Sequence, residues 1–378
     1  MMKDLAALGL VKSVARACDL LLAFQQEGEV LRLRDLVART GLNAATILRL
    51  IGTLEQRGLV ERVQKNEYRS NVKTITRSRY KLGYASQGED ASFSQEWTES
   101  ILRTAATEGI ALMALNNGFT PETALRNVDI FIRERVNLVI EHQFNEQLAP
   151  IISSKLLAAG IPLIAMGTAH PGATYYGGNN YGAGLMGGRY LGRWAKKFWK
   201  GADELLLLEL SMAGPLLQSR LTGVEVGVKE IFPNLPVLHL KGTAQFGDTL
   251  ALVRKYLSHT QARRVLVGAV NDPCALGALR GFEESGLVEN CAVMGQGGSA
   301  EGRAELRRPG TRLVGTVAFF PEQYGEHIIG LALDILNKKT VPPAVFVNHQ
   351  LLTPANVGHY YPNDILTSPL NRTKPMLP

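Results

Sequence analysis

The sequence predicts an α/β protein in which an N-terminal winged helix-turn-helix precedes two lobes with doubly wound parallel sheets. Three observations predict this architecture. Residues 32–58 have the apolar spacing of two short helices joined by a tight turn at Gly41. Beyond residue 80, short apolar runs alternate with amphipathic stretches, which is typical of parallel sheets with helical crossovers. The alternation runs through two successive series, which indicates two similar lobes.

The helix pair at residues 32–58 is predicted to have one buried face. Apolar residues recur there at helical spacing, with Leu33, Leu36 and Val37 in the first helix and Ile47, Leu48, Ile51 and Leu54 in the second. An earlier helix over Val11–Phe24 offers five apolar side chains to pack beneath the pair: Val14, Ala17, Leu20, Leu21 and Phe24. The segment Leu59–Arg69, with polar residues at its tip, is predicted to form a two-stranded wing.

The leading turns of the second helix are the predicted DNA-reading surface. Asn43 can cap this helix, so small residues followed by Thr and Arg lie on its outward turns, and such residues let a helix enter the major groove deeply. The candidate DNA contacts of the helix are Asn43, Ala44, Ala45, Thr46 and Arg49. Three cations of the wing, Arg62, Lys65 and Arg69, are predicted to lie along the phosphate backbone.

The charge distribution supports double-stranded DNA as the partner. Residues 1–82 contain 15 Lys and Arg against 8 Asp and Glu, whereas the remaining residues contain 26 of each sign. The formal charge of +7 therefore lies in the first fifth of the chain, where phosphate contacts need it. A basic terminus that is simply exposed to solvent would give the same count. The basic excess coincides with the helix-turn-helix pattern, however, and this favours DNA binding. A homodimer reading a palindromic operator is expected, because one winged helix makes few phosphate contacts.

Composition and cysteine usage predict a cytoplasmic protein. With 46% hydrophobic and 20% charged residues, the chain falls in the class of globular proteins. The three cysteines, Cys18, Cys274 and Cys291, are scattered without metal-ligand spacing, which favours reduced thiols. Charged residues such as Lys12 interrupt the apolar start of the chain, so no signal peptide is expected. No apolar run reaches the length of a membrane span.

The sequence divides into four predicted segments: a winged helix-turn-helix at 1–70, a linker at 71–79, two lobes at 80–356 and a loosely attached tail at 357–378. The first series of strands is expected at Tyr80–Ser86, Ile110–Leu115, Asn137–Glu141 and Ile161–Met166. The second is expected at Glu204–Leu210, Val237–Leu240, Arg263–Val270 and Ala292–Gly295. Helical patterns lie between them at Phe93–Glu108, Pro121–Arg135, Gly184–Lys200, Leu216–Ile231 and Pro273–Ser285.

The chain is predicted to pass between the lobes twice. It enters the second lobe near Tyr181, and it returns near Phe319 because Thr316–Phe320 and a helix over Pro321–Lys339 need a sheet to pack on. Lobe 1 is therefore expected at about 80–180 and 320–345, and lobe 2 at about 181–319.

Two sets of motifs carry resemblances to known families. The first set is Val14–Leu21, Thr40–Leu42, Thr46, Arg49-Leu50, Thr53-Leu54, Gly58–Val60 and Tyr68. With it, residues 9–70 resemble the winged helix-turn-helix of IclR-type bacterial regulators. The second set is Ala159–Pro162, Gly178–Asn180 with Gly184, Arg220–Gly223 and Asn271–Gly277. With it, residues 80–356 resemble the type 1 periplasmic-binding fold of ribose-binding proteins and LacI-type effector domains. The chain looks like a fusion of the two, since each family usually carries a different second domain.

The second resemblance implies a small-molecule effector, first of all a sugar, bound between the lobes. It implies that Arg220 and Asn271 bind the ligand from lobe 2, and an arginine suits hydroxyls or a carboxylate because its donors are planar and bidentate. It places Phe93, with Trp97 one turn further, where an aromatic side chain stacks on a sugar ring. The remaining candidate effector contacts are Phe246, Gln296 and Phe319. Asp272 is expected to cap the following helix, with Pro273 at its first position.

Three positions depart from the sugar-binding pattern. Gly167-Thr168 stands where sugar binders have an Asp-Arg pair, Gly297 stands where they have an acidic residue, and Phe319 replaces a Gln. The loss of two carboxylates and the gain of a phenyl group remove acceptors for sugar hydroxyls. A less hydroxylated ligand, a different binding mode and an empty cleft therefore remain as alternatives.

These observations favour a ligand-responsive transcription regulator that needs no cofactor and is not an enzyme. One alternative is a sugar-binding receptor of a transporter, which predicts an export signal and no DNA-binding head. The other is an NAD-dependent enzyme, because Gly182–Gly187 satisfies G-x-G-x-x-G and Glu209 follows a strand. Residues 175–180 are not predicted to form the strand that such a site requires, so these glycines are expected to allow close helix packing. No catalytic constellation or metal spacing is found.

Overall fold

The computed structural model describes residues 11–24, 28–71, 80–88, 92–210 and 214–364. It separates into two compact units, of which one contains the chain up to Tyr80 and the other contains the chain from Lys81 onward apart from residues 106–111. Each unit is described by itself. All of the predicted linker except Asn71 lies outside the described residues.

The first unit is a winged helix with one more strand than the sequence predicts. Its helices are α1 (Lys12–Leu22), α2 (Leu33–Thr40) and α3 (Ala44–Gln56), and its strands are β1 (Val30–Arg32), β2 (Val60–Gln64) and β3 (Glu67–Ser70). The strands form an antiparallel sheet in the order β1-β3-β2. Strand β1 is too short to show an alternating pattern in the sequence. Helix α2 ends at Gly41, whose positive φ of 68° suits a residue without a Cβ.

The core of this unit is built from the predicted helix faces, with two exceptions. Its buried members are Leu20, Ala23, Phe24, Leu31, Leu36, Ile47, Ile51, Leu54, Val60 and Tyr68. Val14 and Leu48 are 59% and 41% exposed, so their predicted burial is wrong. The apolar stripe of α3 is narrower than the spacing suggests, and Leu48 lies beside Arg49 on the outward side.

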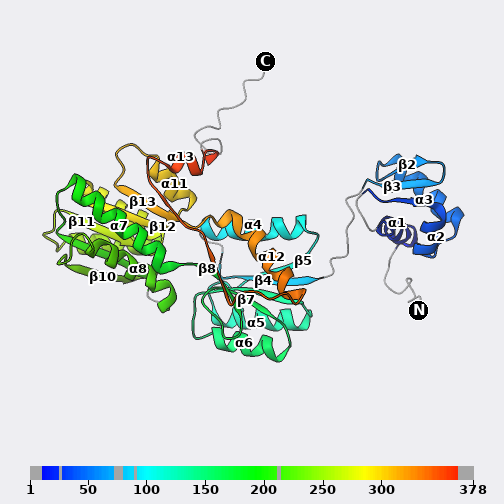
Figure 1. The fold of residues 1–378 in the computed structure, drawn as a ribbon, viewed down its shortest axis with the longest axis horizontal. Coiled ribbons are helices and arrows are strands. Elements are labelled where there is room, and N and C mark those ends of the chain that lie inside the picture. The colour runs from blue at the N-terminus through cyan, green and yellow to red at the C-terminus, as the bar shows by residue number, and fades with distance from the viewer. Residues whose placement is uncertain (1–10, 25–27, 72–79, 89–91, 211–213, 365–378) are drawn as a thin grey trace, which may run out of the picture. The chain divides into compact units, whose positions relative to one another are not determined.

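Lobe 1 of the second unit has helices on both faces of a six-stranded sheet (Figure 1). The strand order is β14-β8-β7-β6-β4-β5. Its strands are β4 (Lys81–Ser86), β5 (Ala111–Asn116), β6 (Leu138–Gln143), β7 (Leu163–Gly167), β8 (Thr174–Gly178) and β14 (Ala344–Val347). Helices α4 (Ser92–Thr107) and α12 (Tyr324–Leu336) cover one face, and α5 (Pro121–Arg133) and α6 (Ala149–Ala158) cover the other.

Lobe 2 repeats this plan with a second six-stranded sheet, in the order β10-β9-β11-β12-β13-β15. Its strands are β9 (Glu204–Leu210), β10 (Val237–Gly242), β11 (Val265–Ala269), β12 (Cys291–Gly297), β13 (Leu313–Ala318) and β15 (Gln350–Leu352). Its helices are α7 (Asn180–Phe198), α8 (Pro215–Lys229), α9 (Phe246–Leu257), α10 (Asp272–Glu284) and α11 (Ala300–Leu306). Neighbouring strands are parallel except at β15, which pairs antiparallel with β13. The predicted doubly wound parallel sheets are thus confirmed.

The chain passes between the lobes three times, once more than predicted. It passes from β8 to α7, from β13 back to the short helix η3 (Pro321–Gln323) and α12, and from β14 to β15. Two expectations are therefore wrong. Residues 174–178 form a strand, because Tyr175 and Tyr176 favour β-structure and pair with β7 and β14. Residues 357–364 are not loose, since α13 (Val357–Tyr360) packs on lobe 2 with Val357 buried, and the rest of the predicted tail lies outside the described residues.

Glycines let the first two helices of lobe 2 pack backbone to backbone. A Cβ on Gly184 would overlap the carbonyl oxygen of Arg220, and one on Gly188 would overlap that of Val224. On the facing helix, a Cβ on Gly223 or Gly227 would meet the α7 backbone. The glycines of the G-x-G-x-x-G pattern therefore include one needed for helix packing, as the sequence predicts, although the strand before them does exist.

Candidate effector cleft and DNA-binding surface

A cavity of about 590 Å³ lies between the lobes, where the carboxyl ends of their strands meet. Lobe 1 contributes the ends of β6, β7 and β8, and lobe 2 contributes the ends of β9, β10 and β12. Six of the seven predicted effector contacts line this cavity: Phe93, Trp97, Arg220, Asn271, Gln296 and Phe319. Phe246 does not line it and is 44% exposed at the start of α9, next to the lining residue Gln245.

Eight aromatic side chains of lobe 1 line the cavity, and six of them contact one another in a continuous group that we name the aromatic wall. Its members are Phe93, Trp97, His142, Phe144, Tyr176 and Tyr324. Trp97 stacks on His142 with ring centroids 4.1 Å apart, and it packs against Tyr324 at 5.3 Å. Burial lowers the pKa of His142 to about 3, so this imidazole is neutral and presents an uncharged ring. Rings of this kind can stack on an apolar face of a ligand.

Arg220 is the cation of the lobe 2 side of the cleft. Its Nε and Nη2 donate to Asn180 Oδ1 at 3.2 and 2.8 Å, and its Nη1 donates to the carbonyl oxygen of Val270 at 2.7 Å. The Phe319 ring lies beneath the guanidinium, with the Arg220 Cζ 4.7 Å from the ring centroid. Desolvation in the cleft lowers the pKa of Arg220 to about 10, so it keeps its charge at neutral pH.

The capping roles of Asn271 and Asp272 differ from the prediction. Asn271 caps α10 by accepting from the Cys274 backbone N–H at 2.9 Å, and its Nδ2 donates to the carbonyl oxygen of Ala244. Asp272 is the first helical residue and is fully buried, and Pro273 is the second. The Asp272 carboxylate accepts from Thr316 Oγ1 at 2.5 Å and from the Ser299 backbone N–H at 2.6 Å. Asn and Asp both cap helices well, so the sequence alone does not decide between neighbours.

Some polar atoms of lining residues have no hydrogen-bond partner within the described residues. They are Trp97 Nε1, His142 Nε2 and both amide atoms of Gln296, which is fully buried. Buried polar groups normally find partners, because an unpaired group keeps its desolvation cost. A bound ligand with hydroxyl groups is one source of such partners.

Backbone geometry explains two departures from the sugar-binding pattern. Gly297 has a φ of 130°, a conformation that side chains avoid, so an acidic residue does not fit this backbone without strain. Gly167 has a φ of 81°, and a Cβ there would lie 2.8 Å from the Gln143 carbonyl oxygen. Both positions line the cavity. The backbone conformation at Gly167 and Gly297 therefore disfavours carboxylate side chains at these two positions.

The sequence prediction misses four members of the aromatic wall, which are His142, Phe144, Tyr176 and Tyr324. His142 and Phe144 come shortly after the apolar run at 138–140, so their place at a strand end was a usable signal. Tyr176 was missed because the sequence analysis did not predict strand β8. Tyr324 comes from α12, which is far from Trp97 along the chain. Contact between two side chains so far apart in the sequence leaves no local sequence pattern.

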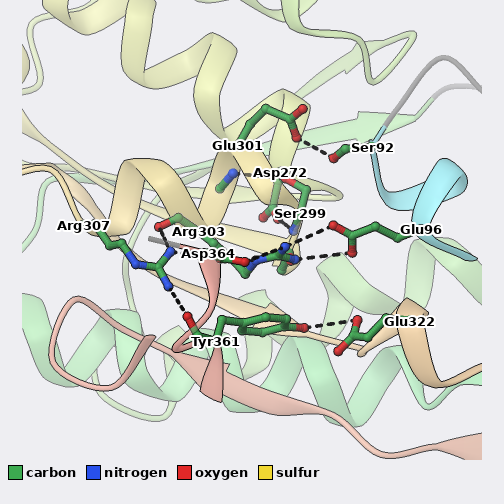
Figure 2. A network of polar contacts seen from close by, with 12 residues as sticks. Ser92, Glu96, Asp272, Ser299, Glu301, Arg303, Arg307, Glu322, Tyr361 and Asp364 are labelled. Carbon is green, nitrogen blue, oxygen red and sulfur yellow. Dashed lines mark hydrogen bonds and ion pairs between the residues drawn. The ribbon is translucent and has the colours of Figure 1, made fainter. Parts of the chain in front are cut away.

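A polar network, which we name the inter-lobe network, joins the two lobes and the C-terminal segment (Figure 2). Arg303 of α11 donates from Nη2 to Glu96 Oε1 of α4 at 3.0 Å and from Nε to Asp364 Oδ2 at 2.7 Å. Its Cζ lies 4.0 Å from the ring centroid of Tyr361. Ser92 Oγ of lobe 1 donates to a Glu301 carboxylate of lobe 2 at 2.5 Å. The sequence gives no sign of this network, because its members are dispersed from Ser92 to Asp364.

The start of α3 is exposed, as a DNA-reading helix requires. Asn43 caps the helix by accepting from the Thr46 backbone N–H at 2.8 Å. Ala44, Ala45 and Arg49 are exposed, and Thr46 is half-buried. The Arg49 side chain has no ion-pair partner within the described part of the chain, so its guanidinium is available to a phosphate or a base edge.

The three cationic residues of the wing differ in whether they pair with carboxylates. Lys65 lies exposed at the wing tip, next to Asn66 with its positive φ of 64°, and has no ion pair among the described residues. Arg69 donates to Glu61 at 2.9 Å, and Arg62 lies 3.8 Å from a Glu55 oxygen. DNA phosphates would therefore compete with carboxylates for these two arginines.

The sequence prediction omits two further arginines near this surface. Arg32 and Arg34 line a hollow of the first unit together with Ala44 of α3 and Lys65 of the wing. Arg32 donates to Glu67 at 3.0 Å, and Arg34 is 3.6 Å from Asp35. Both belong to the basic excess counted in the sequence, but they precede the predicted reading helix.

Among the described residues, none of the helices combines the length and apolar character needed to cross a membrane. Within the same residues, His, Cys, Asp and Glu side chains do not gather into a group that could hold a metal ion.

Both parts of the chain match family models. Residues 82–340 match the family model of the periplasmic binding protein domain, and residues 13–64 match that of the IclR helix-turn-helix domain. No curated protein matches the chain in sequence.

Several solved structures share the two-lobed fold. One is a Mycobacterium smegmatis protein in complex with β-D-fucofuranose, which is 20% identical, with 76% of this chain and 96% of that chain covered at a TM-score of 0.69. An Actinobacillus succinogenes periplasmic solute-binding protein with bound D-allose is 18% identical, and the match covers 75% of this chain and 100% of that chain at a TM-score of 0.67. A Bacillus halodurans solute-binding protein with bound myo-inositol is 21% identical, and the match covers 75% of this chain and 97% of that chain at a TM-score of 0.67.

Proposed function

We propose that this chain, which belongs to the periplasmic binding protein domain family and carries an IclR helix-turn-helix domain, is a ligand-responsive transcription regulator. The observation that carries the proposal is the presence in one chain of an exposed reading helix and an enclosed cleft. A cleft alone fits a transport receptor, and a winged helix alone fits any DNA-binding protein. Their combination fits a protein whose DNA binding responds to a small molecule.

The effector is proposed to act by changing the balance between arrangements of the two lobes. A ligand that contacts both the aromatic wall and Arg220 stabilises the closed arrangement relative to the open one, and its differential affinity sets the size of the shift. In a homodimer, this shift alters the placement of two winged helices on a palindromic site. Thr46 and Arg49 are proposed to contact bases or adjacent phosphates, and Lys65, Arg62 and Arg69 to contact the backbone.

A small carbohydrate-like molecule is the proposed ligand class. The similar structures named above hold a furanose, an aldose and a cyclitol, and the cleft offers aromatic rings and unpaired polar atoms suited to such a molecule. Neither matched family model describes an enzyme family, which supports a binding role. The protein is proposed to act in the cytoplasm, where its DNA target lies.

Replacement of Arg49 tests the DNA-binding part of the proposal. We expect Arg49→Ala to weaken binding to an operator from the protein's own genome by about 1–3 kcal/mol, since an arginine at a base edge contributes this much. Fluorescence anisotropy at several salt concentrations measures the change, and binding should weaken steeply with salt. Arg133→Ala, which removes an exposed arginine of α5, should leave the affinity unchanged.

Other outcomes favour the alternatives. If the purified chain binds a sugar but attaches to no duplex fragment in a salt-dependent way, the transport-type receptor is the better interpretation. Thermal stabilisation by NAD would favour the nicotinamide enzyme, because a ligand that binds the folded state raises the melting temperature.

A further inference from the structure

A guanidinium without an acidic partner lines the effector cleft. The three hydrogen bonds of Arg220 go to neutral acceptors, namely the Asn180 side-chain oxygen and the Val270 carbonyl oxygen. A guanidinium has five N–H donors, so one N–H on each terminal nitrogen remains without a partner in the described residues. A donor on each of the two terminal nitrogens can pair with the two oxygens of one carboxylate.

The acidic side chains of the cleft are committed elsewhere. Among the described lining residues, carboxylates belong only to Asp248 and Asp272. Asp248 accepts from the backbone N–H and hydroxyl of Thr243, and Asp272 accepts from Thr316 and Ser299. Asp272 lies close enough to favour the charged form of Arg220, but it makes no hydrogen bond to it. Burial raises the pKa of Asp272, which weakens it as a counter-ion.

The surroundings of Arg220 fix its orientation rather than its charge. The Phe319 ring, 4.7 Å from the Arg220 Cζ, and the acceptor Asn180 Oδ1 hold the guanidinium plane in place. A desolvated cation that is held rigidly and lacks an ion pair is costly in the empty site, and an anion entering the cleft would offset that cost. The positions that lack hydroxyl acceptors, Gly167 and Gly297, lie in the same cavity. Among the described lining residues, the one cation thus keeps N–H donors without partners, whereas both carboxylates already accept hydrogen bonds.

We infer that the cleft selects a ligand bearing a carboxylate, held by the two unpaired N–H groups of Arg220, while its ring or chain packs on the aromatic wall. The chemical class is a sugar acid, that is a uronate or an aldonate, in preference to the corresponding neutral sugar or polyol. This inference rests on the proposed function only in taking the cleft as the effector site.

Matched pairs of ligands test the inference on the unmodified full-length chain. The probes are D-glucuronate against D-glucose, D-galacturonate against D-galactose, and D-gluconate against D-glucitol, each measured by isothermal titration calorimetry at one pH and ionic strength. We expect at least one acid to bind about tenfold or more tightly than its neutral partner, as a charge-assisted bidentate pair provides. Equal or tighter binding of the neutral partner, or no binding by any of the acids, overturns the inference.

Variants of Arg220 then locate the effect. Arg220→Gln should abolish the preference for the acid, and Arg220→Lys should keep only part of it, because a lysine retains the charge but not the fork. Arg263→Gln, at an exposed arginine of the same lobe, should retain the full preference. Persistence of the preference in a folded Arg220→Gln chain contradicts the assignment.

Operator binding separates this inference from the proposed function. A chain that prefers the acid but binds no duplex DNA supports the carboxylate ligand and refutes the regulator. A chain whose operator affinity responds to a neutral sugar, with no response to its acid, supports the regulator and refutes the carboxylate ligand.

Discussion

Glu141 is a carboxyl group enclosed in lobe 1 with a single neutral partner. It is fully buried in β6, its Oε1 accepts from Asn117 Nδ2 at 2.9 Å, and its Oε2 has no partner within the described residues. Asn117 is held in turn by Asn127, whose Nδ2 donates to Asn117 Oδ1 at 3.0 Å. Burial raises the pKa of Glu141 from 4.5 to about 8, so the protonated form prevails at neutral pH.

This shift makes the stability of the protein depend on pH with a definite sign. Because the folded state holds the proton more tightly than the unfolded state, the contribution of Glu141 is complete below pH 4.5 and is lost as pH rises towards 8. Between these limits it declines by about 1.4 kcal/mol per pH unit. Glu141→Gln should remove this decline, measured as the free energy of unfolding in urea at pH 5, 6.5 and 8.

The comparison of variant with wild type isolates Glu141. The buried neutral His142 contributes in the opposite direction, because its lowered pKa favours the folded state as pH rises, but it is present in both chains. Glu122→Gln, at an exposed position of α5, should reproduce the wild-type dependence. A wild-type decline in the Glu141→Gln variant contradicts the assignment of the titrating group.

At the residue scale, the sequence places six residues in the cleft but indicates neither the rest of its lining nor its internal bonding. Arg220 and Asn271 follow from the family motif, and they do line the cavity. Whether Asn271 or Asp272 caps α10 depends on where the helix begins, and a shift of one residue exchanges their roles. Partners such as Asn117 for Glu141 come together only when separate strands and helices assemble, so no local pattern indicates them.

The close packing of α7 against α8 depends on glycines, which have no side chain. Gly188→Ala should destabilise the protein by about 1–3 kcal/mol, because its Cβ would overlap the backbone of Val224 and force the helices apart. Thermal unfolding of the full chain by differential scanning calorimetry measures the loss.

Gly330 supplies the matched control for this substitution. It lies exposed in α12, and a Cβ there would meet no atom within 4 Å. Gly330→Ala should therefore leave stability unchanged or raise it by up to about 1 kcal/mol, since alanine favours helix more than glycine does. A loss in Gly330→Ala as large as that in Gly188→Ala would refute the steric explanation.

At the element scale, apolar runs predict the central strands, and edge strands escape prediction. The apolar runs at 138–140 and 205–208 lie buried inside their sheets, so a continuous apolar pattern marks them. β14 and β15 are short edge strands with mixed burial, and their pairing depends on partners far along the chain. The same holds for β1 of the winged helix.

At the scale of the whole molecule, the inter-lobe network ties the stability of one lobe to the other. The Arg303 side chain is 6% exposed between Glu96 of lobe 1 and Asp364 of the C-terminal segment. Arg303→Gln should lower stability by roughly 1–3 kcal/mol, because Glu96 loses its ion pair with Arg303 while Asp364 keeps its pair with Arg307. The melting temperature of the full chain reports this change.

An exposed arginine of the same region provides the comparison. Arg308 pairs with Glu283 and Glu305 at the surface of lobe 2, with 46% of its side chain exposed. Arg308→Gln should cost at most about 1 kcal/mol, as exposed ion pairs generally do. If both variants melt at the same temperature, the network does not hold the lobes together.

The three passages of the chain between the lobes also fix the order in which its parts are completed during synthesis. The winged helix has all of its strands by Ser70, whereas one sheet lacks an edge until β14 emerges and the other until β15. A chain interrupted before residue 344 would therefore carry a complete winged helix and an incomplete two-lobed domain. Under the proposed regulator function, such a fragment would bind an operator without responding to an inducer.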